Sequence, residues 1–151
     1  MTVQTNADTS IKVSIAAPAT HDAAGFGALS FTAVGEIVSS GEKGGAGALV
    51  THSPLDKRAV QKFKGSVNYG SYPLSMGLDL ADAGQVIMAS LALGAEIDTV
   101  ASFEETKQDG SIEYYRALVM SYTRVGGTID AVIGSNATLE LTDTIVDVAA
   151  P

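Results

Sequence analysis

The chain has 151 residues, enough for one domain that buries roughly 70% of its unfolded surface, and it carries a net charge of −8. It contains no cysteine, which excludes disulfides and thiolate metal sites, and no run of about 18 apolar residues that would predict a membrane span. Only 6% of the residues are aromatic and tryptophan is absent. The small side chains suit closely spaced sheets. Met1–Ser10 also lacks the basic and apolar regions of a secretory signal.

The charge is divided unevenly along the chain. Residues 1–64 hold six Lys or Arg against five Asp or Glu, whereas residues 65–151 hold three against twelve. Four cations lie in one short run: Lys57, Arg58, Lys62 and Lys64. Such a division is compatible with an ordinary surface. The alternative hypothesis is that a basic segment of one subunit meets an acidic face of the next.

The N-terminal part of the chain predicts strands. Met1–Ser10 has no periodicity, and we expect a flexible arm there. Ile11–Ala17 alternates apolar and polar residues and predicts a strand. His21–Gly27 predicts a turn, and Leu29–Val38 a second strand bent at Gly35.

The segment from Ser39 to Gly65 breaks this pattern. Glycines near its start, then Pro54 and the basic run, predict a long loop, within which Ala48–Thr51 could form a hairpin arm. Ser66–Leu80 returns to strand character. Its candidate buried residues are Tyr69, Tyr72, Leu74, Met76 and Leu78.

One helix is predicted, over Ala83–Leu93. Asp82 provides an N-cap, Gln85 follows three residues later as in a capping box, and Gly94 is suited to end the helix. Its expected apolar face consists of Val86, Ile87, Leu91 and Leu93.

Long antiparallel strands are predicted after the helix. Gln108-Asp109-Gly110 predicts a hairpin turn between Glu96–Lys107 and Ser111–Val125, because Asp-Gly accommodates positive φ. The remaining expected segments are a turn at Gly126-Gly127, a strand over Thr128–Ile133, a turn at Gly134-Ser135-Asn136, a strand over Thr138–Val148 and a frayed end at Ala149–Pro151. The sequence therefore predicts a single mainly β domain over residues 11–148. We expect an antiparallel β-sandwich or partly open barrel with one flanking helix, about 83–93, and a long loop, about 39–65.

The residue patterns of catalytic, metal and cofactor sites are missing. The two histidines have no metal-ligand spacing, and neither a Gly-x-Ser-x-Gly motif nor a phosphate-binding loop occurs. Glu104 and Glu105 would face opposite sides of a strand and cannot form a hydrolytic pair, and we interpret Asp143 and Asp147 as surface carboxylates. We expect no catalytic residue, metal or cofactor, and no enzymatic activity. The acidic charge also argues against specific nucleic-acid binding.

The strand-to-helix junction Leu78-Asp79-Leu80-Ala81-Asp82-Ala83-Gly84-Gln85 resembles that of the major tail tube proteins of long-tailed, siphovirus-type bacteriophages. The resemblance in layout extends from about Lys12 to Val148. It implies a structural virion protein that forms stacked hexameric rings, a tube through which DNA is ejected into the host. Its partners would be further copies of itself and other tail proteins, such as terminator, tape measure and baseplate or tip. DNA would pass without specific binding, no membrane would be contacted, and the protein would be assembled in the host cytoplasm and reside in the virion tail.

In such a tube the basic segment would supply contacts between subunits and rings: Lys57, Arg58, Lys62, Phe63 and Lys64. Asp79, Asp82 and Gln85 would cap the helix and define the junction. Two alternatives stay open. One is another β-sandwich virion component, a tail terminator or decoration protein. The other is a carbohydrate-binding β-sandwich, against which the absence of tryptophan counts.

Overall fold

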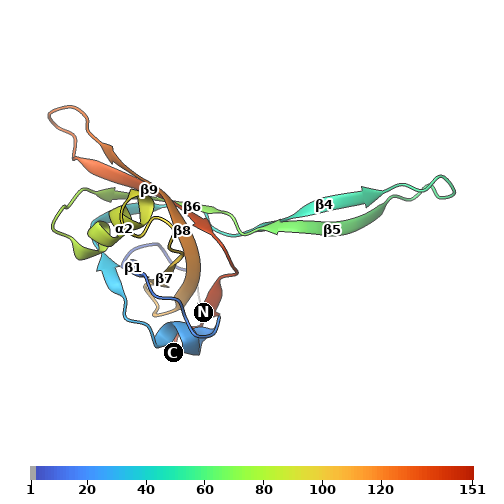
Figure 1. Ribbon diagram of the computed structural model, residues 1–151, viewed down its shortest axis with the longest axis horizontal. Helices are drawn as coiled ribbons and strands as arrows, with labels where there is room; N and C mark the ends of the chain where they lie inside the picture. The colour runs from blue at the N-terminus through green and yellow to red at the C-terminus, as the bar shows by residue number, and fades with distance from the viewer. Residues whose placement is uncertain (1–2) are drawn as a thin grey trace.

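The computed structural model describes residues 3–151, and its strands form one antiparallel sheet and a separate hairpin (Figure 1). The sheet has the order β2-β1-β7-β8-β9-β6-β3, with β10 paired to β8, and it does not close into a barrel. The hairpin consists of β4 and β5. The strands are β1 Ser10–Ser14, β2 Thr32–Val34, β3 Ile37–Ser40, β4 Ala46–His52, β5 Gln61–Asn68, β6 Ser71–Gly77, β7 Ala101–Thr106, β8 Ile112–Val125, β9 Gly134–Leu141 and β10 Val146–Val148. The helices are α1 Ala23–Gly27 and α2 Ala83–Leu93. The predicted mainly β class and the predicted helix over residues 83–93 are confirmed.

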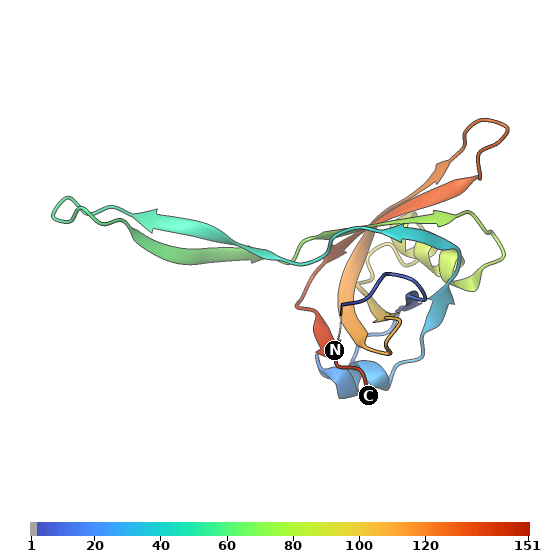
Figure 2. The ribbon, with the colours of Figure 1, turned by 180° about the vertical axis from the view of Figure 1, so that it is seen from behind.

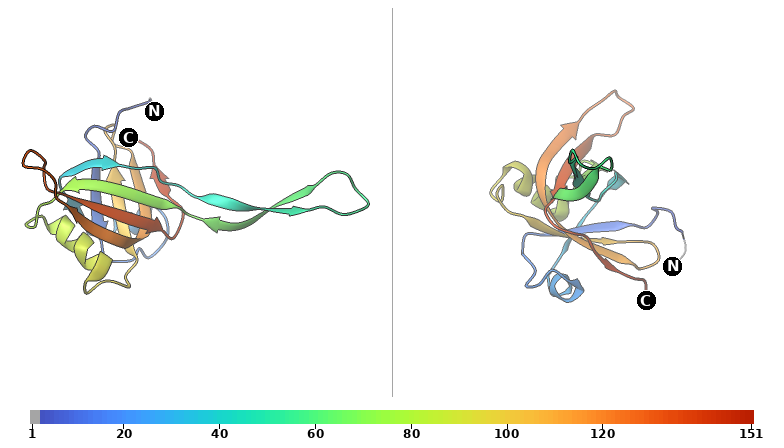
Figure 3. Two further views of the ribbon diagram at one scale, coloured as in Figure 1. Left: turned by 90° about the horizontal axis from the view of Figure 1, so that it is seen from above. Right: turned by 90° about the vertical axis from the view of Figure 1, so that its right-hand side faces the viewer.

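Strand β8 is long enough to belong to both halves of the sheet. Its first part, Ile112–Ala117, pairs with β7, and its second part, Ala117–Val125, pairs with β9. The register shifts between Val119 and Ser121, which marks a bulge. β8 curves through this region, so the two halves of the sheet turn toward each other (Figure 3).

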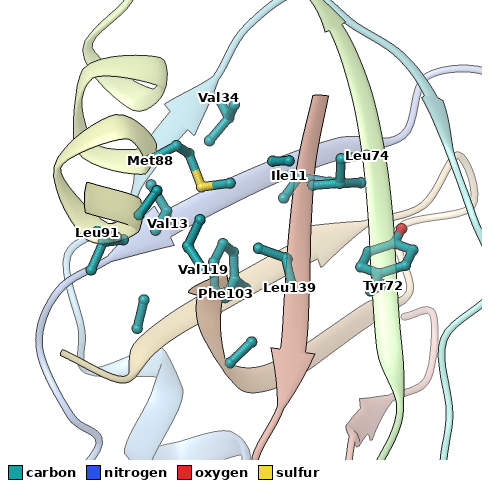
Figure 4. Close-up of a cluster of buried hydrophobic side chains, with 14 of the residues drawn as sticks. Ile11, Val13, Val34, Tyr72, Leu74, Met88, Leu91, Phe103, Val119 and Leu139 are labelled. Carbon is teal, nitrogen blue, oxygen red and sulfur yellow. The ribbon is translucent and has the colours of Figure 1, made fainter. Parts of the chain in front are cut away.

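The core lies between these halves (Figure 4). Period-two alternation places one set of side chains from each strand inside, and β6 contributes Tyr72, Leu74 and Met76 as predicted. Phe103 of β7 is fully buried and stacks on Tyr115 of β8 at 5.3 Å between ring centroids. The other two candidates from the same stretch, Tyr69 and Leu78, are only partly buried.

Helix α2 closes one end of this core. Met88 and Leu91 are buried, whereas Val86 is 55% and Leu93 78% exposed, so the predicted apolar face is wrong at these two positions. The orientation follows from Gly84, because a Cβ there would lie 2.1 Å from the carbonyl oxygen of Ala33. The first turn of α2 therefore sits directly on β2, and this contact decides which face is inside.

Three local predictions in the N-terminal half are corrected. The expected turn at 21–27 contains the short helix α1, whose N-cap Asp22 accepts a hydrogen bond from the Gly25 N–H at 2.8 Å. The expected strand over 29–38 is divided into β2 and β3 at Glu36, which has a φ of +62°. The expected strand over 66–80 is likewise divided, into β5 and β6 at residues 69–70.

The hairpin between β8 and β9 also differs from expectation. Strand β9 begins at Gly134, where a turn was predicted, and the expected strand over 128–133 is a loop. The reason is pairing. Gly134 lies opposite both Val125 of β8 and Gly77 of β6, so its backbone is held in the ladder despite its turn propensity. The predicted Asp109-Gly110 turn between β7 and β8 is confirmed.

Residues 1 and 2 of the expected N-terminal arm lie outside the described residues. Within the rest of that arm, the Gln4 side chain accepts a hydrogen bond from the Asp109 N–H at 3.1 Å, and Asn6 donates one to Ser40 at 3.3 Å. Neither described helix is long or apolar enough to span a membrane.

Candidate assembly surface

Strands β4 and β5 form an arm, residues 46–68, that projects from the rest of the molecule (Figure 2). It occupies most of the segment that was predicted to be a long loop, and it extends the hairpin expected around residues 48–51. Every residue of β4 and most of β5 are exposed. An isolated two-stranded hairpin is at best marginally stable in water. The arm therefore has the character of a surface that a partner covers.

The two faces of the arm differ in chemistry. Thr51 pairs with Lys62 and Leu49 with Lys64, so both lysines project from one face. Val50 pairs with Phe63, and these side chains project from the opposite face, 47% and 56% exposed. The face with Lys62, Lys64 and the exposed Leu49 is termed the cationic face below, and the face with Val50 and Phe63 the apolar face.

The predicted contact residues are distributed over the arm. Lys62 and Lys64 lie together, whereas Phe63 lies on the other face rather than among the cations. Lys57 and Arg58 belong to the loop at the tip of the arm. Besides these four cations the arm carries a single carboxylate, Asp56.

The strand-to-helix junction is a hydrogen-bonded unit far from the arm in sequence. The Asp82 carboxylate caps α2 by accepting from the Gln85 N–H at 2.9 Å, and it also accepts from the Gly35 N–H at 3.0 Å. Gln85 is 2% exposed. In a capping box its side chain would accept from the N–H of the N-cap residue, Asp82. It accepts instead from the Asp79 N–H, three residues earlier, at 3.0 Å. Asp82 and Gln85 therefore join α2 to Gly35 in the β2–β3 corner, and Asp79 holds the chain between β6 and α2 against Gln85.

A buried ionic cluster lies where the arm meets the body, formed by Lys43, Tyr72, Glu105, Lys107 and Glu113. The Glu105 side chain is fully buried and accepts hydrogen bonds from Lys43, from Lys107 at 3.1 Å and from the Tyr72 hydroxyl at 2.6 Å. Lys43 also pairs with Glu113 at 2.6 Å, and its Nζ lies 4.6 Å from the centroid of the Tyr72 ring.

Protonation in this cluster is set by opposing effects. Burial disfavours the charged form of Glu105, but the hydrogen bonds from Lys43 and Tyr72 outweigh it and lower the pKa of Glu105 below its ordinary value of 4.5. Burial and the bond to Glu105 raise the pKa of Tyr72 to about 12. Burial likewise opposes the charge of Lys43, yet Glu105 and Glu113 raise the pKa of Lys43. The raised pKa of Lys43 and the lowered pKa of Glu105 keep this pair charged at neutral pH.

We expect the cluster to make stability depend on pH in the acid range. A carboxylate whose pKa is lowered by folding stabilises the native state above its unfolded pKa, and this contribution is lost as the pH falls. Between pH 7 and pH 3, the free energy of unfolding of the parent should therefore fall more steeply than that of Glu105→Gln. The control is Glu104→Gln, which removes the neighbouring, partly exposed carboxylate and leaves the cluster intact. Parallel curves for the parent and Glu105→Gln, from denaturant melts, would contradict this.

The sequence did not reveal the cluster. Lys43 and Glu105 are 62 positions apart, and only their burial together distinguishes them from surface charges. The available signal was the predicted opposite facing of Glu104 and Glu105, because one member of such a pair faces the core. In the structure Glu105 is buried and Glu104 is partly exposed.

No protein-family model matches the sequence, and no curated protein sequence matches it. Solved structures match over nearly the whole chain. A chain in the sixfold-symmetrised baseplate of the anti-feeding prophage is 11% identical, with 99% of this chain and 98% of that chain covered and a TM-score of 0.69. A chain in the C6-symmetric tail of an empty gene transfer agent particle is 14% identical, with coverages of 97% and 100% and a TM-score of 0.64. The SPP1 tail tube is 13% identical, with coverages of 93% and 76% and a TM-score of 0.61.

These neighbours come from contractile injection systems as well as from tails. The structural similarity therefore does not point specifically to the long-tailed phages whose tube proteins the sequence resembles. At such low identity it establishes the architecture alone. The chain has the fold found in tail tubes and in the baseplates of contractile injection systems.

Proposed function

We propose that this chain is a non-enzymatic structural subunit of a tail tube, which self-assembles into stacked hexameric rings and forms the conduit for DNA ejection. The observation that carries the proposal is the exposed arm on a fold whose solved examples include a tail with C6 symmetry. A projecting ribbon without a partner leaves backbone groups and apolar side chains in water. Contact with neighbouring copies would pair these backbone groups and bury these apolar side chains.

The two faces of the arm fit two neighbouring surfaces. The apolar face, with Val50 and Phe63, gains from burial against another subunit, at about 25 cal/mol per Å² of apolar area removed from water. The cationic face, with Lys62 and Lys64, is complementary to the acidic remainder of the chain. An arm placed between two subunits satisfies both, which favours stacking of one ring on the next. Lys57 and Arg58 at the tip extend the same charge.

The outward face of β6 and β9 is suited to line a passage for DNA. Its alternating positions carry small polar groups, among them Ser71, Ser75, Asn136 and Thr138, and the charged residue Glu140. Neither strand contains a lysine or arginine. Because phosphate contacts from cations supply nonspecific DNA affinity, such a lining lets the duplex pass without being held.

This function places the protein in the virion tail, after assembly in the bacterial cytoplasm. Further copies of itself and the terminator, tape measure and baseplate or tip proteins would be its partners. The resemblance at the strand-to-helix junction points to siphovirus-type tails. No cofactor is needed for this role, and no membrane is contacted.

The direct test is the assembly state of the purified chain. We expect particles far larger than the 15.4 kDa subunit in analytical ultracentrifugation, and sixfold rings or tubes in electron micrographs at high concentration. A strictly monomeric protein at every concentration and salt would contradict the proposal.

A second candidate is a component of the end of a tube rather than its wall. It is favoured by the matches to chains in a sheath/tube terminator and in a tube terminating cap. The micrographs separate the two, because an end component forms single rings that do not stack.

A further inference from the structure

The arm has two short connections to the body, residues 41–45 and residues 69–70. Neither of its strands packs extensively on a body element among the described residues. The two connections touch each other closely, since a Cβ on Gly70, whose φ is +92°, would lie 1.9 Å from the carbonyl oxygen of Gly44. This contact holds the connections together, and one backbone hydrogen bond ties each of them to the body: the Gly41 N–H donates to the Pro73 carbonyl at 2.8 Å, and the Leu141 N–H donates to the Gly70 carbonyl at 2.9 Å. Between Gly41 and the arm, the first connection has Lys43 as its link to the body.

Lys43 links the first connection to the body. The connection has the sequence Gly-Glu-Lys-Gly-Gly, in which Glu42 is exposed and the Lys43 side chain is 11% exposed. The Lys43 Nζ lies between Glu105 and Glu113 and over the rings of Tyr72 and Tyr115, at 4.6 and 5.7 Å from their centroids. The position of this nitrogen is therefore specified from several directions.

We propose that Lys43 is a positioning residue, which fixes the direction of the arm by inserting its ammonium group between the buried carboxylate of Glu105 and the partly exposed carboxylate of Glu113. A buried ion pair costs nearly as much in desolvation as it gains by attraction, so apolar side chains of the same size stabilise a fold equally well. What the ions add is directional specificity, because a lysine Nζ must reach its acceptors within hydrogen-bond distance. The use of that direction, alignment of the arm with a neighbouring subunit, rests on the proposed function. The fixed direction itself does not.

The cluster contains its own control. Lys107 binds the same two carboxylates, at 3.1 Å from Glu105 and 3.9 Å from Glu113, but it lies in the body, at the β7–β8 turn. Lys107→Met should perturb the cluster without releasing the arm. Lys43→Met removes the same charge, but it should also let the arm change its direction relative to the body.

The experiment measures the distance between the arm and the body by double electron–electron resonance. The chain has no cysteine, so Thr51→Cys on the arm and Asn136→Cys on β9, both exposed, carry the only two spin labels. Labelled protein is diluted into unlabelled protein, so that only distances within one subunit are measured whether or not the chain assembles. We expect a narrow distribution for the parent and for Lys107→Met. For Lys43→Met we expect loss of the narrow peak and a broad distribution.

Far-UV circular dichroism and thermal melts of each labelled variant confirm folding. If Lys43→Met fails to fold, the double variant Lys43→Met with Glu105→Gln removes both members of the pair, leaves Lys107 and Glu113, and should give the same broad distribution. If the Lys43 variant that folds, single or double, gives a narrow distribution, the proposal is overturned. It is also overturned if Lys107→Met broadens the distribution as much as Lys43→Met does. Failure of the proposed function would give a different result. The parent would then not form rings, but its arm-to-body distance distribution would still be narrower than that of Lys43→Met.

Discussion

Replacing Gln85 with leucine should lower the free energy of unfolding by about 3 kcal/mol or more, since it leaves buried polar groups without partners. The Gln85 side chain accepts from the Asp79 N–H and the Tyr122 hydroxyl, at 3.0 and 2.9 Å. It donates to the carbonyl oxygens of Gly35 and Gly77, at 3.0 and 2.8 Å. All four hydrogen bonds are lost in the leucine variant, although its size is similar. Chemical denaturation of dilute subunit, followed by circular dichroism, measures the loss.

The matched control is Gln108→Leu, the same chemical change at an exposed position in the β7–β8 turn. It should change the free energy of unfolding by less than about 0.5 kcal/mol. Equal effects of the two substitutions would show that the hydrogen bonds of Gln85 contribute nothing specific. The result matters beyond stability, because Gln85 connects α2 to β6, to β8 and to the corner between β2 and β3.

Reversing two charges on the arm, in the variant Lys62→Glu with Lys64→Glu, should abolish assembly at physiological salt while the subunit stays folded. Each exposed ion pair contributes only about 0–1 kcal/mol. In the proposed ring of six copies, however, reversal turns every such attraction into a repulsion at once. Sedimentation and electron microscopy measure assembly, and melting curves should remain those of the parent, because both side chains are exposed on a hairpin outside the core.

Phe63→Ala distinguishes the two faces of the arm. It should weaken assembly to an extent that does not depend on salt, whereas high salt should partly restore the charge-reversed variant by screening repulsion. A control reversal, Lys12→Glu, changes a partly exposed lysine of β1 outside the arm and should leave assembly unchanged. If the arm variant polymerises as well as the parent, the basic segment is an ordinary solvated surface.

The elements that sequence predicted well are those whose signals are local. Asp82 and Gly94 mark the ends of α2, Asp109-Gly110 marks a hairpin, and alternation of Tyr72, Leu74 and Met76 marks a half-buried strand. In each case the residues that carry the signal are neighbours in the chain. The local rule and the final structure therefore agree.

The features that could not be predicted depend on contacts between distant segments. Val86 and Leu93 are exposed because Gly84 sets the helix against β2, which local periodicity does not encode. Gly134 lies in a strand because β6 and β8 pair with it on both sides. The face occupied by Phe63 follows from the register between β4 and β5. If that register shifted by one residue, Phe63 would lie opposite Leu49 on the cationic face instead of opposite Val50.

The lengths of the outer strands have a consequence for solubility. The sheet ends in β2, of three residues, and β3, of four, while the arm strands β4 and β5 have seven and eight. Short outer strands offer few free backbone groups to a foreign chain and so resist amyloid-like aggregation. On the longer strands of the arm, the positive charges of the β5 lysines disfavour the addition of a foreign strand. At high concentration the subunit is thereby protected from joining other chains in the wrong geometry.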